Sequence, residues 1–150
     1  MFIMFMGLPG SGKSTKALEM YETYTYLNLP VIYISSDKVR MDVFGVEFHP
    51  DLEPWVWGYI ERVVKSKLDH KENIVILDST NLTKTGRETF LRFARARGHE
   101  TVGVYMSTPL HTCMERIANR ERKVPKDVLE RMEKSRTMPD EIEFTKLIVF

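Results

Sequence analysis

Five short runs of apolar residues recur along the 150-residue chain, and longer stretches with helical spacing separate them. The runs comprise residues Phe2 to Met6, Val31 to Ile34, Ile74 to Leu77, Thr101 to Met106 and Leu147 to Phe150. Because polar residues do not alternate within them, they are typical of strands that helices cover on both faces. The pattern therefore predicts an α/β fold, a three-layer sandwich with one five-stranded parallel sheet.

The stretches between these runs predict helices. They cover residues Lys13 to about Leu27, Glu53 to Leu68 and Thr83 to about Arg97, and two more begin at Pro109 and at Pro125. Proline is favoured in the first turn of a helix, and a glycine such as Gly98 is favoured after the last turn. Since neither a repeat nor a low-complexity linker interrupts the chain, residues 1–150 are expected to form a single domain.

Composition excludes several classes of protein. The chain has 22 Lys plus Arg against 21 Asp plus Glu, so any attraction to a polyanion must come from local patches, and a histone-like binder is excluded. The single Cys113 and four dispersed histidines exclude a disulfide framework and a zinc site, and Cys113 is expected to pack. No apolar run approaches the roughly 18 to 20 residues of a membrane span, so we expect a soluble cytoplasmic protein with no membrane partner.

A glycine-rich loop provides the strongest functional signal. The segment GLPGSGKST at residues 7–15 matches G-x-x-x-x-G-K-[ST] and lies between a predicted strand and a predicted helix. Glycines let the backbone N–H groups surround a phosphate, and the N-terminus of the helix adds positive potential. The residues expected to bind ATP or another NTP are Gly10, Ser11, Gly12, Lys13, Ser14 and Thr15. In such loops the lysine, here Lys13, reaches the β- and γ-phosphates, and the hydroxyl at Ser14 ligates Mg²⁺.

Asp78 directly follows the apolar run at residues 74–77. It is therefore expected at the carboxyl edge of the sheet, where open α/β sheets bind ligands, and is a candidate to face Mg²⁺ through water. An ordinary strand-ending Asp that caps the next turn is the alternative. Ser79 follows Asp78 where a water-activating carboxylate would be needed, no N-K-x-D follows a predicted strand, and no D-x-x-G follows Asp78. A phosphotransferase is thus favoured over a hydrolase or a GTPase.

A phosphotransferase needs a base for the acceptor hydroxyl. Asp37 follows the second predicted strand and is our candidate for this general base. Arg40 lies three residues later, on the same face if a helix begins here, and is expected to orient Asp37 or to clamp the acceptor. The alternative is a helix-capping Asp beside a surface Arg.

A basic segment near residue 120 predicts a mobile lid over residues 116 to about 126. Arg116 and Arg120 would share a helical face, and Pro125 separates them from the next helix. We expect Arg120 to contact the transferring phosphate and Arg116 to pack on the nucleotide base. A solvated basic helix is the alternative.

Two further groups bear on the acceptor. Trp55 and Tyr59 are one helical turn apart, and core packing is favoured over base stacking for both. Basic residues dominate the predicted helix after Asn81 and form either a solvated face or a nucleic-acid contact. They are Lys84, Arg87, Arg92, Arg95 and Arg97.

Together these motifs resemble the small P-loop kinases typified by the 5′-hydroxyl polynucleotide kinase domain of tailed phages, with relatives among seryl-tRNA kinases and zeta toxins. The resemblance rests on the GSGKST loop, Asp37 with Arg40, the DSTNL segment at residues 78–82, and Arg116 and Arg120 leading to a Val-Pro pair. It implies that Asp37 is the general base toward a polynucleotide 5′-hydroxyl, that Arg40 holds the acceptor strand and that Arg120 belongs to the lid.

Two departures from the phage pattern concern the residues after the third strand and the signature of a phosphatase. The phage enzyme has Asp-Thr-Asn where this chain has Asp78-Ser79-Thr80, and we favour Asp78 as the equivalent position. The phosphatase signature Asp-x-Asp-x-Thr is absent, so only a kinase reaction is expected.

The sequence therefore predicts an ATP-dependent, Mg²⁺-requiring kinase for the 5′-hydroxyl end of DNA or RNA. A kinase for a nucleoside, a sugar or an aminoacylated tRNA is one alternative. A nucleotide-binding regulatory module that transfers no phosphate is another.

Overall fold

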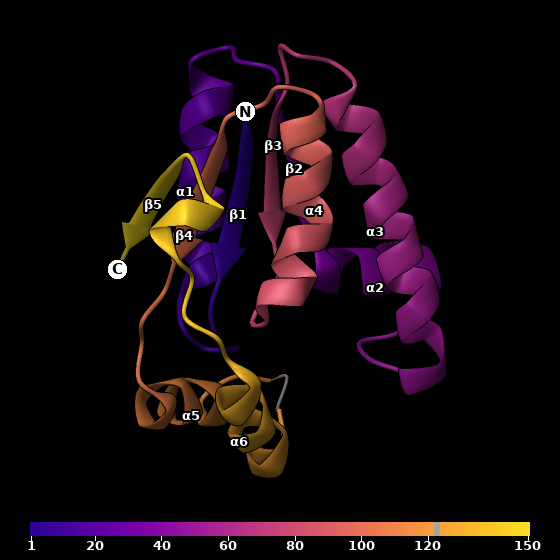
Figure 1. The fold of residues 1–150 in the computed structure, drawn as a ribbon. Helices are drawn as coiled ribbons and strands as arrows, with labels where there is room; N and C mark the ends of the chain where they lie inside the picture. The colour runs from indigo at the N-terminus through magenta and orange to yellow at the C-terminus, as the bar shows by residue number, and fades with distance from the viewer. Residues whose placement is uncertain (122–123) are drawn as a thin grey trace.

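The computed structural model describes residues 1–121 and 124–150. A five-stranded sheet with the order β2-β3-β1-β4-β5 crosses the centre of the molecule (Figure 1), and every pair of neighbouring strands is parallel. The predicted parallel sheet is thereby confirmed. The strands are β1 (Phe2–Met6), β2 (Val31–Ser35), β3 (Ile74–Asp78), β4 (Thr101–Tyr105) and β5 (Lys146–Val149).

Helices connect the strands, and all of them except α2 begin within a few residues of the predicted positions. They are α1 (Lys13–Tyr26), α2 (Ser36–Phe44), α3 (Glu53–Leu68), α4 (Lys84–Ala96), α5 (Leu110–Ala118) and α6 (Lys126–Ser135), with short 3₁₀ turns at Pro50–Leu52 and Glu141–Glu143. Helix α4 begins one residue later than predicted because Thr83 is its N-cap and accepts a hydrogen bond from the N–H of Gly86. None of the helices in the described part of the chain is long and apolar enough to span a membrane.

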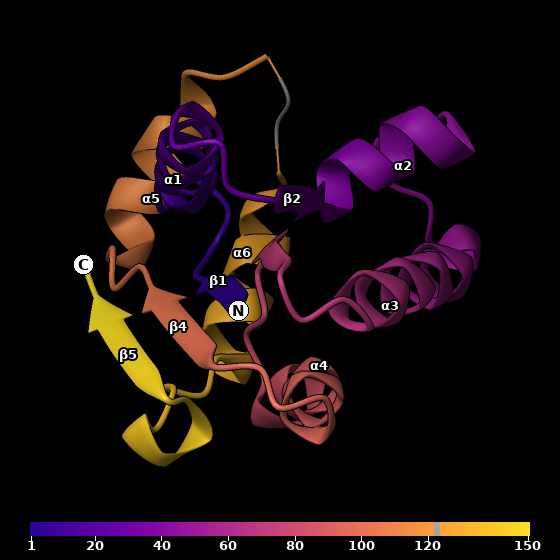
Figure 2. The same ribbon diagram turned by 90° about the horizontal axis from the view of Figure 1, so that it is seen from above.

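Two hydrophobic clusters hold the helices on opposite faces of the sheet (Figure 2). On one face, Ala17 of α1 packs with Ile3 and Phe5 of β1. On the other face, α3 and α4 pack on the alternate residues of the same strands, such as Met4 and Leu77. Alternate residues of β1 and β3 are thus buried on both faces, which explains why their sequences are apolar throughout. The result is the three-layer α/β sandwich that the sequence predicts.

The carboxyl ends of the strands meet at one edge of the sheet because all strands run in the same direction. The loop at residues 7–12 follows β1, Asp37 follows β2, and Asp78 ends β3. Helices α5 and α6 lie below this edge (Figure 1). The edge therefore brings the glycine-rich loop, Asp37 and Asp78 to the same side of the sheet.

One of the basic residues of helix α4 does not lie at the surface. Arg87 is only 1% exposed, and its Nε and Nη2 donate to the two carboxylate oxygens of Glu143 at 2.8 and 2.9 Å. Its Nη1 donates to the carbonyl of Thr137 at 3.0 Å. Arg87 is therefore not available to nucleic acid, because this ion pair uses it to join α4 to the segment that leads into β5.

The charge of Glu143 is expected to stabilise the fold. Replacing Glu143 with Gln leaves Arg87 buried without its anion, which costs about 3 kcal/mol of unfolding free energy at neutral pH. Chemical denaturation measures the difference, and Glu88→Gln, which affects the exposed pair with Arg95, is the matched control with a change below about 0.5 kcal/mol.

The loss of unfolding free energy in Glu143→Gln is expected to depend on pH. Although burial by itself raises the pKa of Glu143, hydrogen bonds from Arg87 and from the backbone N–H of Asp140 hold that pKa below its ordinary value of 4.5. The carboxylate therefore contributes stability above pH 4.5, and this contribution is lost as the pH falls through the lowered pKa. A gap between the wild-type protein and Glu143→Gln that stays constant down to pH 3 would contradict this account.

Candidate functional site

The glycine-rich loop has a backbone that only glycines can adopt here. Gly7, Gly10 and Gly12 have φ angles of 146°, 82° and 94°, all in the region that favours glycine. A Cβ atom on Gly10 would lie 2.7 Å from the carbonyl oxygen of Cys113 in α5. The loop is therefore shaped by its own glycines and also packs closely against the first turns of α5.

Hydrogen bonds with two other segments fix this loop. The N–H of Gly7 donates to the carbonyl of Thr80 at 3.0 Å, and Nδ2 of Asn81 donates to the carbonyl of Phe5 at 2.7 Å. On the other side, the hydroxyl of Thr108 donates to the carbonyl of Ser11 at 2.9 Å. The loop thus keeps one position relative to the end of β3 and to the loop after β4.

The loop leaves donors for an anion. Helix α1 begins after Gly12 without a side-chain N-cap, so the N–H groups of its first turn have no such acceptor. The hydroxyl of Ser11 is buried and has no hydrogen-bond partner within the described residues. Free N–H groups and a buried free hydroxyl at a helix N-terminus are what a phosphate group binds. The arrangement therefore fits a nucleotide phosphate.

Asp78 lies at the end of β3 with its two oxygens in different surroundings. Its Oδ2 accepts a hydrogen bond of 2.7 Å from the hydroxyl of Tyr33 in β2. Its Oδ1 is buried and has no partner within the described residues. Burial has the largest effect on the pKa of Tyr33 and raises it. The negative charge of Asp78 and this hydrogen bond raise the pKa further. Tyr33 therefore keeps its proton and fixes the rotation of the carboxylate, so that Oδ1 alone is free.

The ammonium group of Lys13 interacts with charged side chains from several other segments. Burial lowers the pKa of its ammonium group, the carboxylates of Asp78 and Asp37 raise it, and the guanidinium of Arg120 lowers it again. The structure thus brings together one lysine, two carboxylates and one arginine from four separate segments. A phosphate beside Lys13 would compensate for the burial of its charge.

The oxygens near the loop also fit a magnesium ion. Ser14 is exposed in the first turn of α1, and Asp78 has the free oxygen described above. Within the described residues, no three His, Cys, Asp or Glu side chains are close enough together to hold a metal ion. A cation held by few protein oxygens with the help of phosphates and water is the usual situation for Mg²⁺. Ser14 and Asp78 are therefore the residues that would hold it.

Arg40 connects two carboxylates at the acceptor side of the site. Its Nη1 donates to Asp37 at 2.9 Å, while Nε and Nη2 donate to both oxygens of Glu53 at 2.7 and 2.8 Å. The Nε1 of Trp57 also donates to Glu53, at 3.2 Å. Hydrogen bonds with Glu53 hold the pKa of Arg40 above its ordinary range. Arg40 is thus buried and fixed by α3, and from there it donates to the carboxylate of Asp37.

The two lid arginines lie in different positions from those expected. Helix α5 ends at Ala118, so Arg120 follows the helix instead of sharing a face with Arg116. The Nη1 of Arg116 donates to the carbonyls of Gly10 and Ser11, both at 3.3 Å. Arg116 therefore contacts the glycine-rich loop directly. Residues 122 and 123, within the predicted lid, lie outside the described residues.

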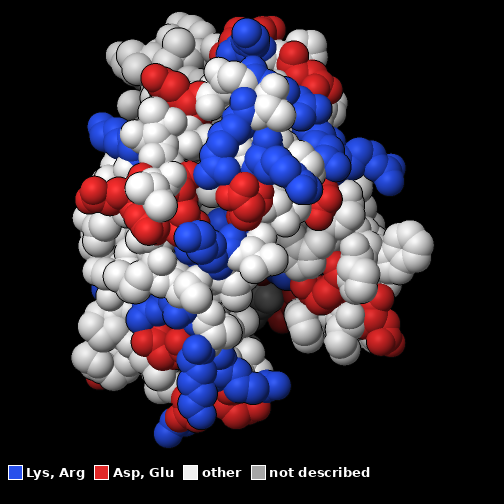
Figure 3. All heavy atoms as spheres, in the orientation of Figure 1, with Lys and Arg blue, Asp and Glu red and all other residues white. Residues whose placement is uncertain are grey.

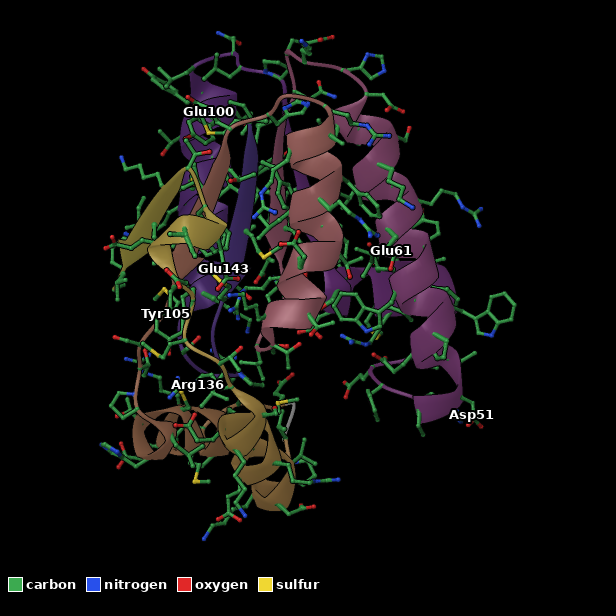
Figure 4. All side chains as sticks on the ribbon, viewed as in Figure 1. Asp51, Glu61, Glu100, Tyr105, Arg136 and Glu143 are labelled. Atoms are coloured by element: carbon green, nitrogen blue, oxygen red, sulfur yellow. The ribbon has the colours of Figure 1, made fainter. Side chains whose placement is uncertain are left out.

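The sequence did not predict a cluster between the sheet and helices α5 and α6, which comprises Tyr105, Glu133 and Arg136. Arg136 follows α6, and Figure 4 shows it below Tyr105, whose ring centroid lies 5.9 Å from the guanidinium. Its Nη2 donates to Glu133 at 2.6 Å. Cys113 is buried nearby, and burial raises the pKa of its thiol against the lowering effect of Arg116 and Arg136. The cluster packs the start of α5 and the end of α6 against the sheet.

Two aromatic residues that were expected in the core are exposed. Trp55 is 70% exposed and Tyr59 is 38% exposed. The tryptophan that packs inward is Trp57, whose ring centroid lies 6.3 Å from that of Phe90. The core prediction for Trp55 and Tyr59 is therefore wrong, because the sheet covers the adjacent face of α3 that carries Val56.

Several basic side chains of α4 and its C-terminus are already bound to acidic residues. Arg95 donates to Glu88 at 2.9 Å. Arg97, the C-cap residue, donates to Asp69 at 2.6 Å. Lys84 and Arg92 are exposed, and no ion pair joins either of them to a carboxylate within the described residues.

Sequence reasoning missed Tyr33 and Glu53. Tyr33 lies in a strand, where a tyrosine is an ordinary residue. Glu53 begins a helix, where an acidic residue is favoured for a reason unrelated to function. Neither residue carries a motif, and both act through side chains that the fold brings to them from elsewhere in the sequence.

A family model described as an AAA domain matches residues 2–139, which is most of the chain. The chain belongs to this family. A similar curated protein is the L-seryl-tRNA(Sec) kinase of Methanococcus maripaludis, which is 26% identical over 132 residues. The aligned part covers 88% of this chain and 51% of that protein, so the chain spans about half the length of this relative.

Solved structures of P-loop proteins share the fold at low identity. Kti12 of Chaetomium thermophilum, in complex with ADP-AlF3, has a TM-score of 0.76 and 18% identity, and the match covers 100% of this chain and 88% of Kti12. A chain of the Pnkp1/Rnl/Hen1 RNA repair complex has a TM-score of 0.69 and 18% identity, over 89% of this chain and 43% of that chain. These matches show the P-loop kinase fold.

The hydrogen bond of Tyr33 is expected to matter for nucleotide binding with Mg²⁺. In Tyr33→Phe the Oδ2 of Asp78 loses its donor, and a hydrogen bond to a charged group contributes about 1.5 to 3 kcal/mol. We expect the affinity for a fluorescent ADP analogue to fall about tenfold in the presence of Mg²⁺ and to change little in EDTA. Tyr21→Phe, which keeps the ring packed beside Tyr33, is the control. Equal losses with and without Mg²⁺ would show that Tyr33 is only structural.

Proposed function

We propose that this member of the AAA domain family is an ATP-dependent kinase that transfers the γ-phosphate of ATP to the 5′-hydroxyl end of a polynucleotide. The observation that carries the proposal is the position of Asp37. Its carboxylate follows β2 at the edge that holds the glycine-rich loop, acts on the charge of Lys13 and is bound by Arg40. A fixed carboxylate beside a phosphate loop is what transfer to a hydroxyl requires.

The reaction assigns one role to each group. Asp37 accepts the proton of the acceptor hydroxyl as its oxygen forms a bond to the γ-phosphorus. The bond between this phosphorus and the bridging oxygen breaks, and ADP leaves with that oxygen. Lys13 and Arg120 neutralise the charge that builds on the phosphate oxygens. Transfer is direct, and no phosphoenzyme intermediate forms.

The remaining site residues hold the donor. The residues from Gly10 to Thr15 surround the phosphates, and Arg116 keeps the loop in place from α5. Mg²⁺ held by Ser14 and Asp78 would supply Lewis-acid charge neutralisation at the β- and γ-phosphates. Tyr33 keeps the free oxygen of Asp78 directed to that position.

The similar proteins support an RNA acceptor. The curated relative is named as a kinase for seryl-tRNA, and one fold neighbour belongs to an RNA repair complex. A second candidate function, favoured by that 26% identical relative, is phosphorylation of the side-chain hydroxyl of an aminoacylated tRNA. The same Asp37 and Lys13 would serve both reactions, so only the acceptor distinguishes them.

A panel of acceptors tests the proposal. The protein is incubated with γ-labelled ATP or GTP, Mg²⁺ and each of 5′-hydroxyl DNA, 5′-hydroxyl RNA, nucleosides, total tRNA and seryl-tRNA. Label on an oligonucleotide 5′ end that a phosphatase removes supports the polynucleotide reaction. Label on seryl-tRNA alone supports the second candidate, and nucleotide binding with no transfer to any acceptor supports a regulatory module.

The general base is tested with Asp37→Asn. The amide cannot accept the hydroxyl proton, so transfer is expected to fall at least about 100-fold. Binding of the ATP analogue should persist, because Asp37 lies on the acceptor side. Asp42→Asn changes an exposed carboxylate of the same helix and should leave transfer unaffected. Full activity in Asp37→Asn would overturn the assignment.

Glu53 is expected to act through Arg40. In Glu53→Gln the two charge-assisted hydrogen bonds weaken, so Arg40 and with it Asp37 lose their fixed position. We expect kcat for transfer to fall roughly tenfold while the affinity for ATP is unchanged, and Glu53→Asp should recover part of the loss. Glu61→Gln in the same helix is the control. A fall in protein stability without a change in kcat would indicate a structural role only.

A further inference from the structure

Cations without a carboxylate partner gather on one face of the protein. Ion pairs occupy many charged side chains of α1, α2 and α6, for example Lys16 with Glu19 and Lys126 with Glu130. On α3, α4 and the turn after α3, by contrast, six basic residues form no such pair within the described residues. They are Arg62, Lys65, Lys67, Lys71, Lys84 and Arg92. Figure 3 shows Lys and Arg side chains crowded over these two helices.

Two of these cations share an aromatic ring. The Nζ of Lys65 in α3 lies 4.0 Å from the ring centroid of Phe93, and the guanidinium of Arg92 lies 5.8 Å from it. Phe93 is only partly buried. Lys65 and Arg92 form no ion pair with a carboxylate within the described residues, and such cations are available to the phosphates of a nucleic-acid backbone. We call Lys65, Arg92 and Phe93 the α3–α4 basic cluster.

The acidic residues of this face are few. Arg95 and Arg97 neutralise Glu88 and Asp69. Glu61, which Figure 4 shows on α3, is the acidic residue that lies between Trp57 and Lys65 along the helix. Glu72, in the turn after α3, is exposed beside Lys71, and the six basic residues outnumber Glu61 and Glu72, so the local potential is positive.

The neighbouring side of the site has the opposite charge. Residues 36–53 carry five acidic side chains against two basic ones, and Asp51 and Asp42, which pairs with Lys38 at 3.0 Å, are exposed there. Like charges repel a polyanion, so the α2 side disfavours a phosphate backbone that leaves the site. The charge distribution thus leaves the α3–α4 side as the favourable direction.

We infer that the α3–α4 basic cluster binds the sugar–phosphate backbone of the acceptor nucleic acid several nucleotides away from the reacting end. The inference rests on the proposed function, since it concerns the acceptor of the same site. Glu53, which fixes Arg40, begins α3, and Lys65 lies twelve residues further along it. At 1.5 Å per residue the two are about 18 Å apart, which is about five nucleotides at the duplex rise of 3.4 Å.

Acceptor length and salt test this inference. Binding of a fluorescent 20-nucleotide 5′-hydroxyl RNA is measured by anisotropy at several salt concentrations for the wild-type protein and for Lys65→Gln/Arg92→Gln. Two lost phosphate contacts should reduce the slope of log K against log salt by about 1.4, or about 0.7 for each contact. The affinity at low salt should fall roughly tenfold. A DNA of the same sequence shows whether the backbone alone is recognised.

A matched control carries the same change of net charge elsewhere. Lys134→Gln/Lys146→Gln removes two exposed cations, at the end of α6 and on β5, that form no ion pair with a carboxylate within the described residues. This variant should keep the wild-type salt slope. Thermal unfolding of both variants shows that each is folded.

Transfer to a short acceptor separates the inference from the function. A 5′-hydroxyl dinucleotide spans about 7 Å, too short to reach Lys65, so Lys65→Gln/Arg92→Gln should phosphorylate it as the wild-type protein does. Its KM for the 20-nucleotide acceptor should rise roughly tenfold. An unchanged salt slope and KM, with transfer intact, would overturn the inference and leave the proposed function standing. Failure of the wild-type protein to bind or phosphorylate any nucleic acid would overturn both.

Discussion

The whole site depends on the link between the glycine-rich loop and the end of β3. The N–H of Gly7 bonds to Thr80, and the side chain of Asn81 bonds back to Phe5. These two hydrogen bonds connect the glycine-rich loop to the strand that ends in Asp78. Because Asn81 is buried, its amide would be costly to leave without a partner, so the connection is maintained in the folded protein. Lys13 and the free oxygen of Asp78 thereby stay in one region.

Two buried arginines form the same kind of ion pair with a glutamate, but the two pairs have different roles. Arg87 forms a two-pronged pair with Glu143 and ties α4 to the C-terminal segment. Arg40 forms the same kind of pair with Glu53, but it has a remaining donor that binds Asp37. Burying charges has a high desolvation cost, which only good geometry offsets. At Arg87 the result is structural, whereas at Arg40 the result is a hydrogen bond to the Asp37 carboxylate at the carboxyl edge of the sheet.

The charges outside the site give its two sides different properties. Acidic residues outnumber basic ones over residues 36–53, whereas α3 and α4 carry basic residues that form no ion pair with a carboxylate in the described part of the chain. A net charge of +1 conceals this division, because it averages the two sides. An acceptor with a phosphate backbone would enter such a site in one orientation, and the same helix that fixes Arg40 would contact the acceptor further along.

The sequence by itself determined the sheet, the glycine-rich loop, the strand-end positions of Asp37 and Asp78, and the helix over residues 53–68, because apolar runs, glycine spacing and helical periodicity are local properties. It did not determine the partners of Tyr33, Glu53 and Arg87, or the exposure of Trp55. A helix residue carries the same pattern whether its side chain meets solvent or a carboxylate from residue 143, as Arg87 does. Likewise, the hydroxyl of Tyr33 finds Asp78 only because β2 and β3 pair in register. These contacts join residues far apart in the chain, and only the tertiary packing that brings them together decided them.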